Sequence, residues 1–271
     1  MSAPAQGAAA AAGQPFLLRE DTGPVRILTI NQADAHNALS GELVAAIGAE
    51  LADAAQDVAV GSVVLTGSGR MFSAGGNLDH LLAERGAEAR AAEVTLLARC
   101  IEVIGALVEF PKPTIAMVNG PVAGGGLALA LGCAVRIASE RARFVYAYTS
   151  IGLAGDLGVN WLLGRLLGRR RALSFALAPS WTAEEALRLG LVDHVASADD
   201  LREVTLGRAR ELAAIPATAF AQIRRNIEAS LLPFAEGAAI EAEAFHAMRD
   251  TDDHRAAVAA LIERMRNRPR K

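Results

Sequence analysis

Two glycine-rich segments lie where a strand-like pattern gives way to a helix-like one, Gly75-Gly76 and Gly124-Gly125-Gly126. Glycine lets a bound molecule approach the main chain closely, so N–H groups there can reach an oxygen atom of that molecule. The helix that follows adds the positive end of its dipole. A pair of such turns suits chemistry in which a carbonyl oxygen gains negative charge, as when a thioester forms its enolate. Each donor would stabilise the transition state by roughly 3–4 kcal/mol.

Each glycine run by itself also has an ordinary structural interpretation, as a tight turn or as close packing of a helix on a sheet. Two nucleotide-binding alternatives have less support. No Gly-Lys-Ser/Thr follows either run, which excludes a P-loop, and neither run has the Gly-x-Gly-x-x-Gly spacing of a dinucleotide site.

The remaining side chains give little support for metal or nucleophile chemistry. The five histidines show no metal-like i, i+4 pairing, and Ser73, beside the first turn, has no apparent His/Asp partner. Cys100 and Cys133 lack CxxC spacing, which argues against a zinc site or a disulfide and favours a reduced, cytoplasmic setting. We therefore expect no bound metal.

The composition narrows the class of protein further. A net charge of −3 and an aromatic share of 4% give no sign of nucleic-acid binding. No charge-free apolar run of about 18 residues occurs, so we expect no membrane span. Residues 1–15 are low in complexity and lack the charged start of a signal peptide, which predicts a disordered tail.

The elements that must position the two turns alternate along the chain. Strand-like apolar runs occur at 24–30, 61–67, 111–120 and 134–139. Ser40 and the Thr182-x-x-Glu185 pattern mark two helix starts. Because the order strand, glycine turn, helix occurs twice, we expect parallel strands with helical crossovers and an α/β fold. We expect a core at 16–198 and a helical C-terminal region at 199–271.

Four segments form a recognisable pattern: Asn31…His36-Asn37-Ala38-Leu39-Ser40, Phe72-Ser73-Ala74-Gly75-Gly76-Asn77-Leu78, Asn119-Gly120-Pro121-Val122-Ala123-Gly124-Gly125-Gly126, and residues 180–195. Together they resemble the crotonase, or enoyl-CoA hydratase/isomerase, family over roughly 16–271. The resemblance implies a spiral of ββα units around two sheets. It also implies that the helical C-terminal region mediates assembly into a homotrimer or a homohexamer.

The same resemblance implies an acyl-CoA substrate, with no cofactor apart from the coenzyme A of that substrate. It implies an oxyanion hole made by the N–H groups of Gly76 and Gly125. Four residues would line the adenine and pantetheine path: Ala74, Gly75, Asn77 and Leu78. The family usually has aspartate where this chain has Asn77, which weakens the adenine-side assignment and leaves the oxyanion hole unaffected.

The catalytic glutamates of the family's hydratases are missing, because the matching positions are Ala128 and Tyr148. One carboxylate remains, Asp156, eight residues after Tyr148. Its local sequence alone favours an N-cap for the following helix. Several branches of the family place an aspartate here, and the surrounding stretch most resembles the isomerases of ring-epoxidised phenylacetyl-CoA. That resemblance favours Asp156 as a single acid/base, with Tyr148 as a wall of the acyl pocket.

We therefore favour an enoyl-CoA isomerase. A hydratase with non-standard catalytic residues and a non-catalytic binder of CoA thioesters stay open as alternatives. A dehalogenase of the 4-chlorobenzoyl-CoA type is disfavoured, because its histidine base would fall at Ile101. The Arg169-Arg170-Arg171 run suits a solvated helix start, and a contact with a CoA phosphate is its functional interpretation.

Overall fold

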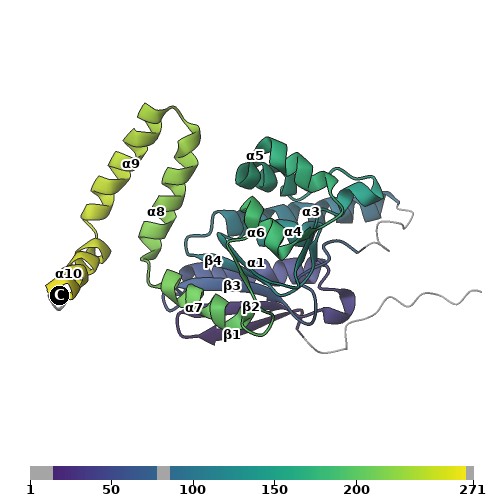
Figure 1. Cartoon of the computed structure of the whole chain (residues 1–271), viewed down its shortest axis with the longest axis horizontal. Helices are drawn as coiled ribbons and strands as arrows, with labels where there is room; N and C mark the ends of the chain where they lie inside the picture. The colour runs from purple at the N-terminus through teal and green to yellow at the C-terminus, as the bar shows by residue number, and fades with distance from the viewer. Residues whose placement is uncertain (1–14, 78–85, 267–271) are drawn as a thin grey trace, which may run out of the picture. The chain divides into compact units, whose positions relative to one another are not determined.

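The computed structural model describes residues 15–77 and 86–266. It contains two compact units, one ending at Ala213 and the other beginning at Ala214 (Figure 1). Apart from Pro15, the disordered tail predicted for residues 1–15 lies outside the described residues. The α/β fold class expected from the sequence is confirmed by the arrangement of strands and helices.

Six of the described strands form the main sheet, in the order β1-β2-β3-β4-β6-β9. Their bounds are β1 Leu17–Thr22, β2 Val25–Ile30, β3 Ser62–Gly67, β4 Thr114–Val118, β6 Val135–Ser139 and β9 His194–Ala196. The edge pair β1–β2 is antiparallel, and all the other neighbours are parallel. Strands β3 and β4 are buried along their whole length, as parallel strands covered by helices usually are.

A second sheet forms within the described residues from β5 (Val122–Ala123), β7 (Arg143–Val145) and β8 (Trp181–Thr182), in that order. Strand β5 is parallel to β7, and β7 is antiparallel to β8. Strand β5 leads directly into the second glycine turn. Its pairing with β7 therefore helps to fix the position of that turn.

Within the described residues, the α-helices of the first unit are α1 Gly41–Gln56, α3 Ala87–Val108, α4 Gly125–Gly132, α5 Val159–Leu177, α6 Ala183–Leu189 and α7 Leu201–Ala213. The two predicted helix starts are confirmed. The Ser40 hydroxyl accepts a hydrogen bond from the Leu43 N–H, and Thr182 and Glu185 form a reciprocal capping box. Helix α5 breaks at Gly168, where φ is 72°, and 169–171 follow as exposed residues at the start of the next helical segment.

The second unit is helical, with α8 Ala217–Glu228, a short 3-10 turn η3 at Ala229–Leu231, α9 Phe234–Arg249 and α10 Asp252–Arg266. The sequence predicts a helical C-terminal region from residue 199, which would place α7 with these helices, but α7 contacts β2, β3 and β4 of the main sheet. Its buried side chains include Leu206 and Ala209. The first unit therefore extends past the predicted boundary at 198/199. No helix in the described residues is long and apolar enough to cross a membrane.

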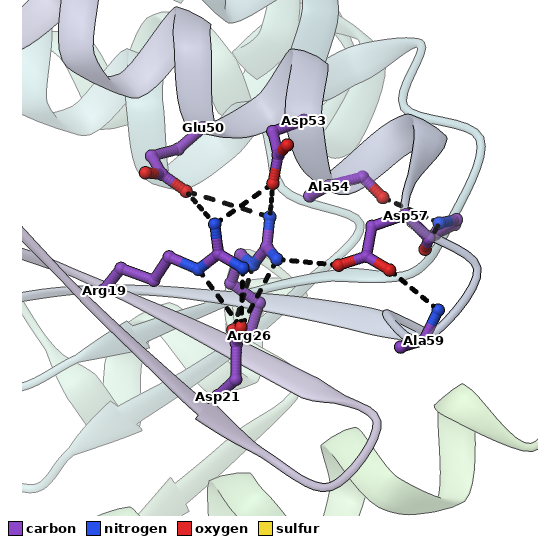
Figure 2. Close-up of polar contacts among 9 residues, drawn as sticks. Arg19, Asp21, Arg26, Glu50, Asp53, Ala54, Asp57 and Ala59 are labelled. Carbon is purple, nitrogen blue, oxygen red and sulfur yellow. Dashed lines mark hydrogen bonds and ion pairs between the residues drawn. The ribbon is translucent and has the colours of Figure 1, made fainter.

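A buried arginine joins the edge of the main sheet to α1. The side chain of Arg26, in β2, has no exposed surface, and Figure 2 shows acidic groups around it. Its guanidinium forms ion pairs with Asp21 of β1 at 3.0 Å, Asp53 of α1 at 2.6 Å, and Asp57 at 3.0 Å. The Lys112 ammonium donates to the carbonyl oxygens of residues 54 and 57, at 2.7 Å each, and so ties the end of α1 to the segment before β4.

Replacing Arg26 with methionine should lower the free energy of unfolding by roughly 2–4 kcal/mol, because it leaves several carboxylates clustered without their shared counter-charge. Denaturant unfolding at low and high salt measures this. High salt should recover part of the loss by screening the repulsion. The matched control is Arg202→Met, which removes an exposed pair with Glu20 and should cost less than about 1 kcal/mol. Equal losses in the two variants would contradict the structural role of Arg26.

Acid should weaken the same cluster. The hydrogen bond from Arg26 holds the pKa of Asp21 and of Asp53 below the ordinary value of 3.8. Since the pKa values are lower in the folded state, their stabilisation is present above the unfolded pKa and is lost as pH falls through the folded pKa. We expect the free energy of unfolding to drop below about pH 4, and to drop less steeply in Arg26→Met. Denaturant unfolding across the acid range checks this, and parallel acid curves would contradict it.

Candidate active site

The loop that follows β3 holds the first glycine turn, and two amide side chains fix its path. The fully buried Asn37 donates to the carbonyl oxygens of Ser68 at 3.0 Å and Met71 at 2.7 Å. The side-chain Oδ1 of Asn119 accepts a hydrogen bond from the Gly67 N–H at 3.2 Å. These residues come from the segment before α1 and from the end of β4. Both belong to the recognised sequence motifs, so part of each motif builds the loop.

The two glycine turns pack directly against each other. The Ala123 N–H donates to the Ser73 carbonyl oxygen at 2.9 Å. A Cβ atom added at Gly75 would lie 2.6 Å from the Gly125 nitrogen, and one added at Gly126 would lie 2.6 Å from the Ser73 Cβ. Gly75 also has a φ of 81°, which disfavours any residue with a side chain. The glycines are therefore required for the contact between the turns, and their structural and chemical interpretations apply together.

A cavity of about 690 Å³ opens beside the paired turns, and its wall is mostly apolar. Among the predicted site residues, those on its wall are Ala74, Gly76, Asn77, Gly125, Tyr148 and Asp156. Gly75 lies behind this wall, in contact with the second turn, so its predicted place on the substrate path is not supported by the cavity lining. Leu78 lies outside the described residues.

Both predicted oxyanion donors lie on this one cavity. Gly125 is the first residue of α4, where an N–H group has no acceptor within the helix. The positive end of the helix dipole lies at the same place. Gly76 is exposed on the wall, and no atom would lie within 4 Å of a Cβ added there. That these two N–H groups form an oxyanion hole stays a prediction, and their position on one cavity supports it.

The two side chains singled out for the acyl end contact each other. The Tyr148 hydroxyl donates a hydrogen bond to Oδ1 of Asp156, and both residues line the cavity. Tyr148 is buried, whereas Asp156 is exposed on the cavity wall. Burial, together with the hydrogen bond to Asp156, raises the pKa of Tyr148 well above its ordinary value of 10.0, so the phenol keeps its proton. The N-cap interpretation of Asp156 is wrong, because α5 begins at Val159 with Gly158 as its cap residue and no side-chain cap.

Strained backbone flanks both members of this pair. Ala147 has a φ of 63° and Leu157 a φ of 51°, values that cost energy in residues with side chains. Two hydrogen bonds hold the loop that contains Asp156. The Ala154 carbonyl oxygen accepts from the Tyr146 hydroxyl at 2.6 Å and from the Asn160 amide at 2.7 Å. These hydrogen bonds, together with the strained backbone at Leu157, restrict the path of the loop that presents Asp156 to the cavity.

One wall of the cavity was missed at the sequence level. Six residues along a face of α3 line it: Ala89, Ala92, Glu93, Leu96, Leu97 and Cys100. Their spacing of three to four residues was the available signal. Burial, and secondly the charge of Asp156, raise the pKa of the Cys100 thiol to about 11, so it is neutral near pH 7. Glu93 adds a second carboxylate to the cavity that the family motifs did not suggest.

The positions that hold other functional groups elsewhere in the family lack them here. Ala128 is fully buried in the core and is absent from the cavity wall. Ile101 is exposed on α3 and also lies off the wall. No histidine lines the cavity within the described residues, and His80 lies outside them. No group of three metal-ligating side chains occurs there either.

A family model described as "Enoyl-CoA hydratase/isomerase" matches residues 20–268. The chain belongs to this family. A solved enoyl-CoA hydratase from Polaromonas sp. JS666 is 34% identical and has a TM-score of 0.86, with 92% of this chain and 97% of that chain covered. The expected crotonase fold is thereby confirmed.

Curated relatives within the enoyl-CoA hydratase/isomerase family differ in their named activities. 4-Chlorobenzoyl coenzyme A dehalogenase-1 from Arthrobacter sp. is 34% identical over 210 residues, which cover 77% of this chain and 76% of the relative. 1,2-Epoxyphenylacetyl-CoA isomerase from Escherichia coli K12 is 32% identical over 216 residues, which cover 79% and 82%. The family assignment therefore supports an acyl-CoA enzyme and leaves the reaction to the residues in the cavity.

Replacing Gly75 with alanine should separate the two turns. We expect at least a 100-fold loss of turnover, the scale seen when one oxyanion donor is displaced, and a stability loss of about 2 kcal/mol. Steady-state kinetics and denaturant unfolding measure the two effects. The control is Gly105→Ala on α3, where the added Cβ meets nothing within 4 Å and should stabilise the helix by about 0.5–1 kcal/mol. Full activity in Gly75→Ala would show that the close approach is unnecessary.

Proposed function

We propose that this family member is an enoyl-CoA isomerase in which Asp156 moves the proton and the N–H groups of Gly76 and Gly125 hold the enolate oxygen. The observation that supports this most directly is the shared cavity. The Asp156 carboxylate and the paired glycine turns lie on its wall, while Ala128 and Tyr148 replace the two glutamates of the hydratases.

The proposed reaction needs no net change of atoms or charge. With a 3-enoyl-CoA bound, an oxygen of the Asp156 carboxylate removes a proton from Cα, and the electron pair of that C–H bond moves into the thioester carbonyl. The two N–H groups stabilise the resulting dienolate oxygen. Asp156 then returns its proton to Cγ, the carbonyl re-forms, and the double bond ends conjugated at Cα–Cβ. One carboxylate serves as base and then as acid.

The relatives support this choice to different degrees. The relative named 1,2-epoxyphenylacetyl-CoA isomerase favours an isomerase. The relative named 4-chlorobenzoyl coenzyme A dehalogenase-1 favours a dehalogenase instead. That chemistry would need a histidine base at the place of Ile101, and this residue is exposed and lies off the cavity wall. We therefore place the dehalogenase below the isomerase.

Glu93 favours a hydratase as the second candidate. Hydration of an enoyl thioester needs one group to activate water and another to deliver a proton to Cα. Glu93 and Asp156 both line the cavity and are of the right type, although neither occupies a position of the family's usual glutamates. In this alternative, both carboxylates would be essential.

The rest of the proposal follows the family. Coenzyme A enters as part of the substrate, so no separate cofactor is required. We propose a homotrimer or a homohexamer, with no nucleic-acid or membrane partner and a place in the cytoplasm. Both cysteines are free and buried, which is compatible with a reducing compartment.

Incubation with a 3-enoyl-CoA in deuterated water tests the reaction. We expect a conjugated 2-enoyl-CoA and no 3-hydroxyacyl-CoA, as followed by absorbance and mass spectrometry. The product should contain deuterium to the extent that the Asp156 carboxyl exchanges its proton with solvent before returning it. Formation of 3-hydroxyacyl-CoA from a 2-enoyl-CoA would establish the hydratase. Chloride release from 4-chlorobenzoyl-CoA would establish the dehalogenase. Binding of these thioesters without any turnover would favour the non-catalytic binder.

Two matched amide variants then assign the carboxylates. Asp156→Asn should lower kcat by about 10²–10⁴-fold while the CoA thioester still binds, because only the acid/base group is lost. Glu93→Gln should keep most of the isomerase rate. A rate in Asp156→Asn equal to that of the unmodified enzyme would remove Asp156 from the mechanism. A collapse in Glu93→Gln alone would move the acid/base role to Glu93.

A further inference from the structure

The phenol of Tyr148 does more than form a wall of the cavity. Its hydroxyl is bonded to Oδ1 of Asp156, and the ring reaches the second glycine turn, with its Cζ atom 4.0 Å from the place of a Cβ at Gly124. The phenol therefore lies between the enolate-binding turn and the carboxylate. Only one oxygen of Asp156, Oδ2, is left without this donor.

We propose that Tyr148 is the positioning residue of the catalytic carboxylate: its hydroxyl occupies Oδ1, stabilises the ionised form of Asp156, and leaves Oδ2 to exchange the proton with substrate. This inference rests on the proposed role of Asp156. It assigns to Tyr148 a function that is absent where the hydratases have glutamate, because a carboxylate at this position would repel Asp156.

The setting of Tyr148 restricts where its hydroxyl can point. Its ring packs edge-on against Tyr146, with ring centroids 5.0 Å apart and planes at 65°. The Leu153 N–H donates to the Tyr148 carbonyl oxygen at 2.9 Å, which ties the turn of Tyr148 to the loop that leads to Asp156. The strained residues Ala147 and Leu157 adjoin the two partners. Because the backbone around both partners is restricted, the hydrogen bond is preorganised, and aligning it during the reaction costs little free energy.

The charge state of the pair follows from the groups around it. Within the described residues, the ionisable groups that act on Asp156 or share its cavity are Tyr148, Tyr146, Cys100 and Glu93. Burial raises the pKa of the two phenols and of the thiol, so all three are neutral near pH 7. Glu93 is the other carboxyl group in this set. A neutral O–H donor bonds more strongly to a carboxylate than to a carboxylic acid, so removal of the Tyr148 hydroxyl should disfavour the carboxylate that it contacts.

Infrared titration of the unliganded protein tests this without any substrate. The carbonyl band of protonated Asp156 is assigned by its loss in Asp156→Asn, in a Glu93→Gln background that removes the carboxyl group of Glu93 from the cavity. We expect Tyr148→Phe to move this protonation upward by about one pH unit. The comparison variant, Tyr146→Phe, removes a hydroxyl that bonds to the Ala154 carbonyl oxygen and not to the carboxylate, so it should shift the midpoint less than Tyr148→Phe does. Coincident curves for Tyr148→Phe and the unmodified residue, or equal shifts in both variants, would overturn the proposal.

A second measurement moves the midpoint in the opposite direction while keeping the hydroxyl. The chain has only two tyrosines, so in Tyr146→Phe every incorporated fluorotyrosine lies at position 148. Fluorination makes the phenol a stronger donor, and the protonation of Asp156 should then move to lower pH. This variant retains the ring and the hydrogen bond, so it keeps the test valid if Tyr148→Phe folds poorly. A midpoint that does not move, or that moves upward, contradicts the proposal.

Kinetics separate this inference from the proposed reaction. If the enzyme isomerises a 3-enoyl-CoA, Tyr148→Phe should lower kcat about tenfold, change KM less, and shift the acid limb of kcat/KM upward with the infrared midpoint. If Tyr148→Phe shifts the infrared midpoint but the enzyme has no isomerase activity, the role of Tyr148 toward Asp156 is supported and the proposed isomerisation is contradicted. Isomerase activity with an unmoved acid limb in Tyr148→Phe would keep the reaction and reject the role of Tyr148.

Discussion

The contact between two stretches of main chain, at Gly75 and at the start of α4, is the constraint on which the site depends. The added-Cβ distance of 2.6 Å from Gly75 to the Gly125 nitrogen leaves no room for a side chain between them. The hydrogen bond between residues 123 and 73 holds the two turns in this register. Because the contact is made by backbone atoms, the N–H groups beside it are positioned by the fold itself and need no side-chain rotamer to be selected.

The parallel pairing of β3 and β4 makes this contact possible. Their register pairs Thr66 with Met117, so the two strands end side by side and both loops leave the same edge of the sheet. Ligands bind at this edge in many α/β proteins, because the carboxyl ends of parallel strands meet there. The hydroxyl of Thr66 donates to the Met117 carbonyl oxygen at 2.8 Å, so the strand ends are also joined by a side chain. The site therefore follows from sheet topology together with a few small or polar residues.

Local patterns predicted the elements that surround the site, and long-range contacts explain what they missed. Strand β2 and helix α1 follow from apolar spacing and from Ser40, because burial and capping leave direct marks on the sequence. Strand β1 was missed, since its side chains are largely exposed and give no apolar alternation. Glu93 was missed for a different reason. Which face of α3 meets the cavity depends on tertiary packing, and no local motif includes it.

Asp156 illustrates how a local rule fails at a functional position. An aspartate just before a helix usually caps it, but here the chain passes through Leu157 and Gly158, both at positive φ, before α5 begins. This path turns the carboxylate toward Tyr148 and gives up the capping bond. Beside a phenol whose raised pKa keeps it protonated, the carboxylate lacks the ionised partner that a two-glutamate site would supply. Addition of water requires two groups to act together, one to activate water and one to deliver a proton. A single carboxylate at this end of the cavity is better suited to moving a proton between two carbon atoms of one substrate.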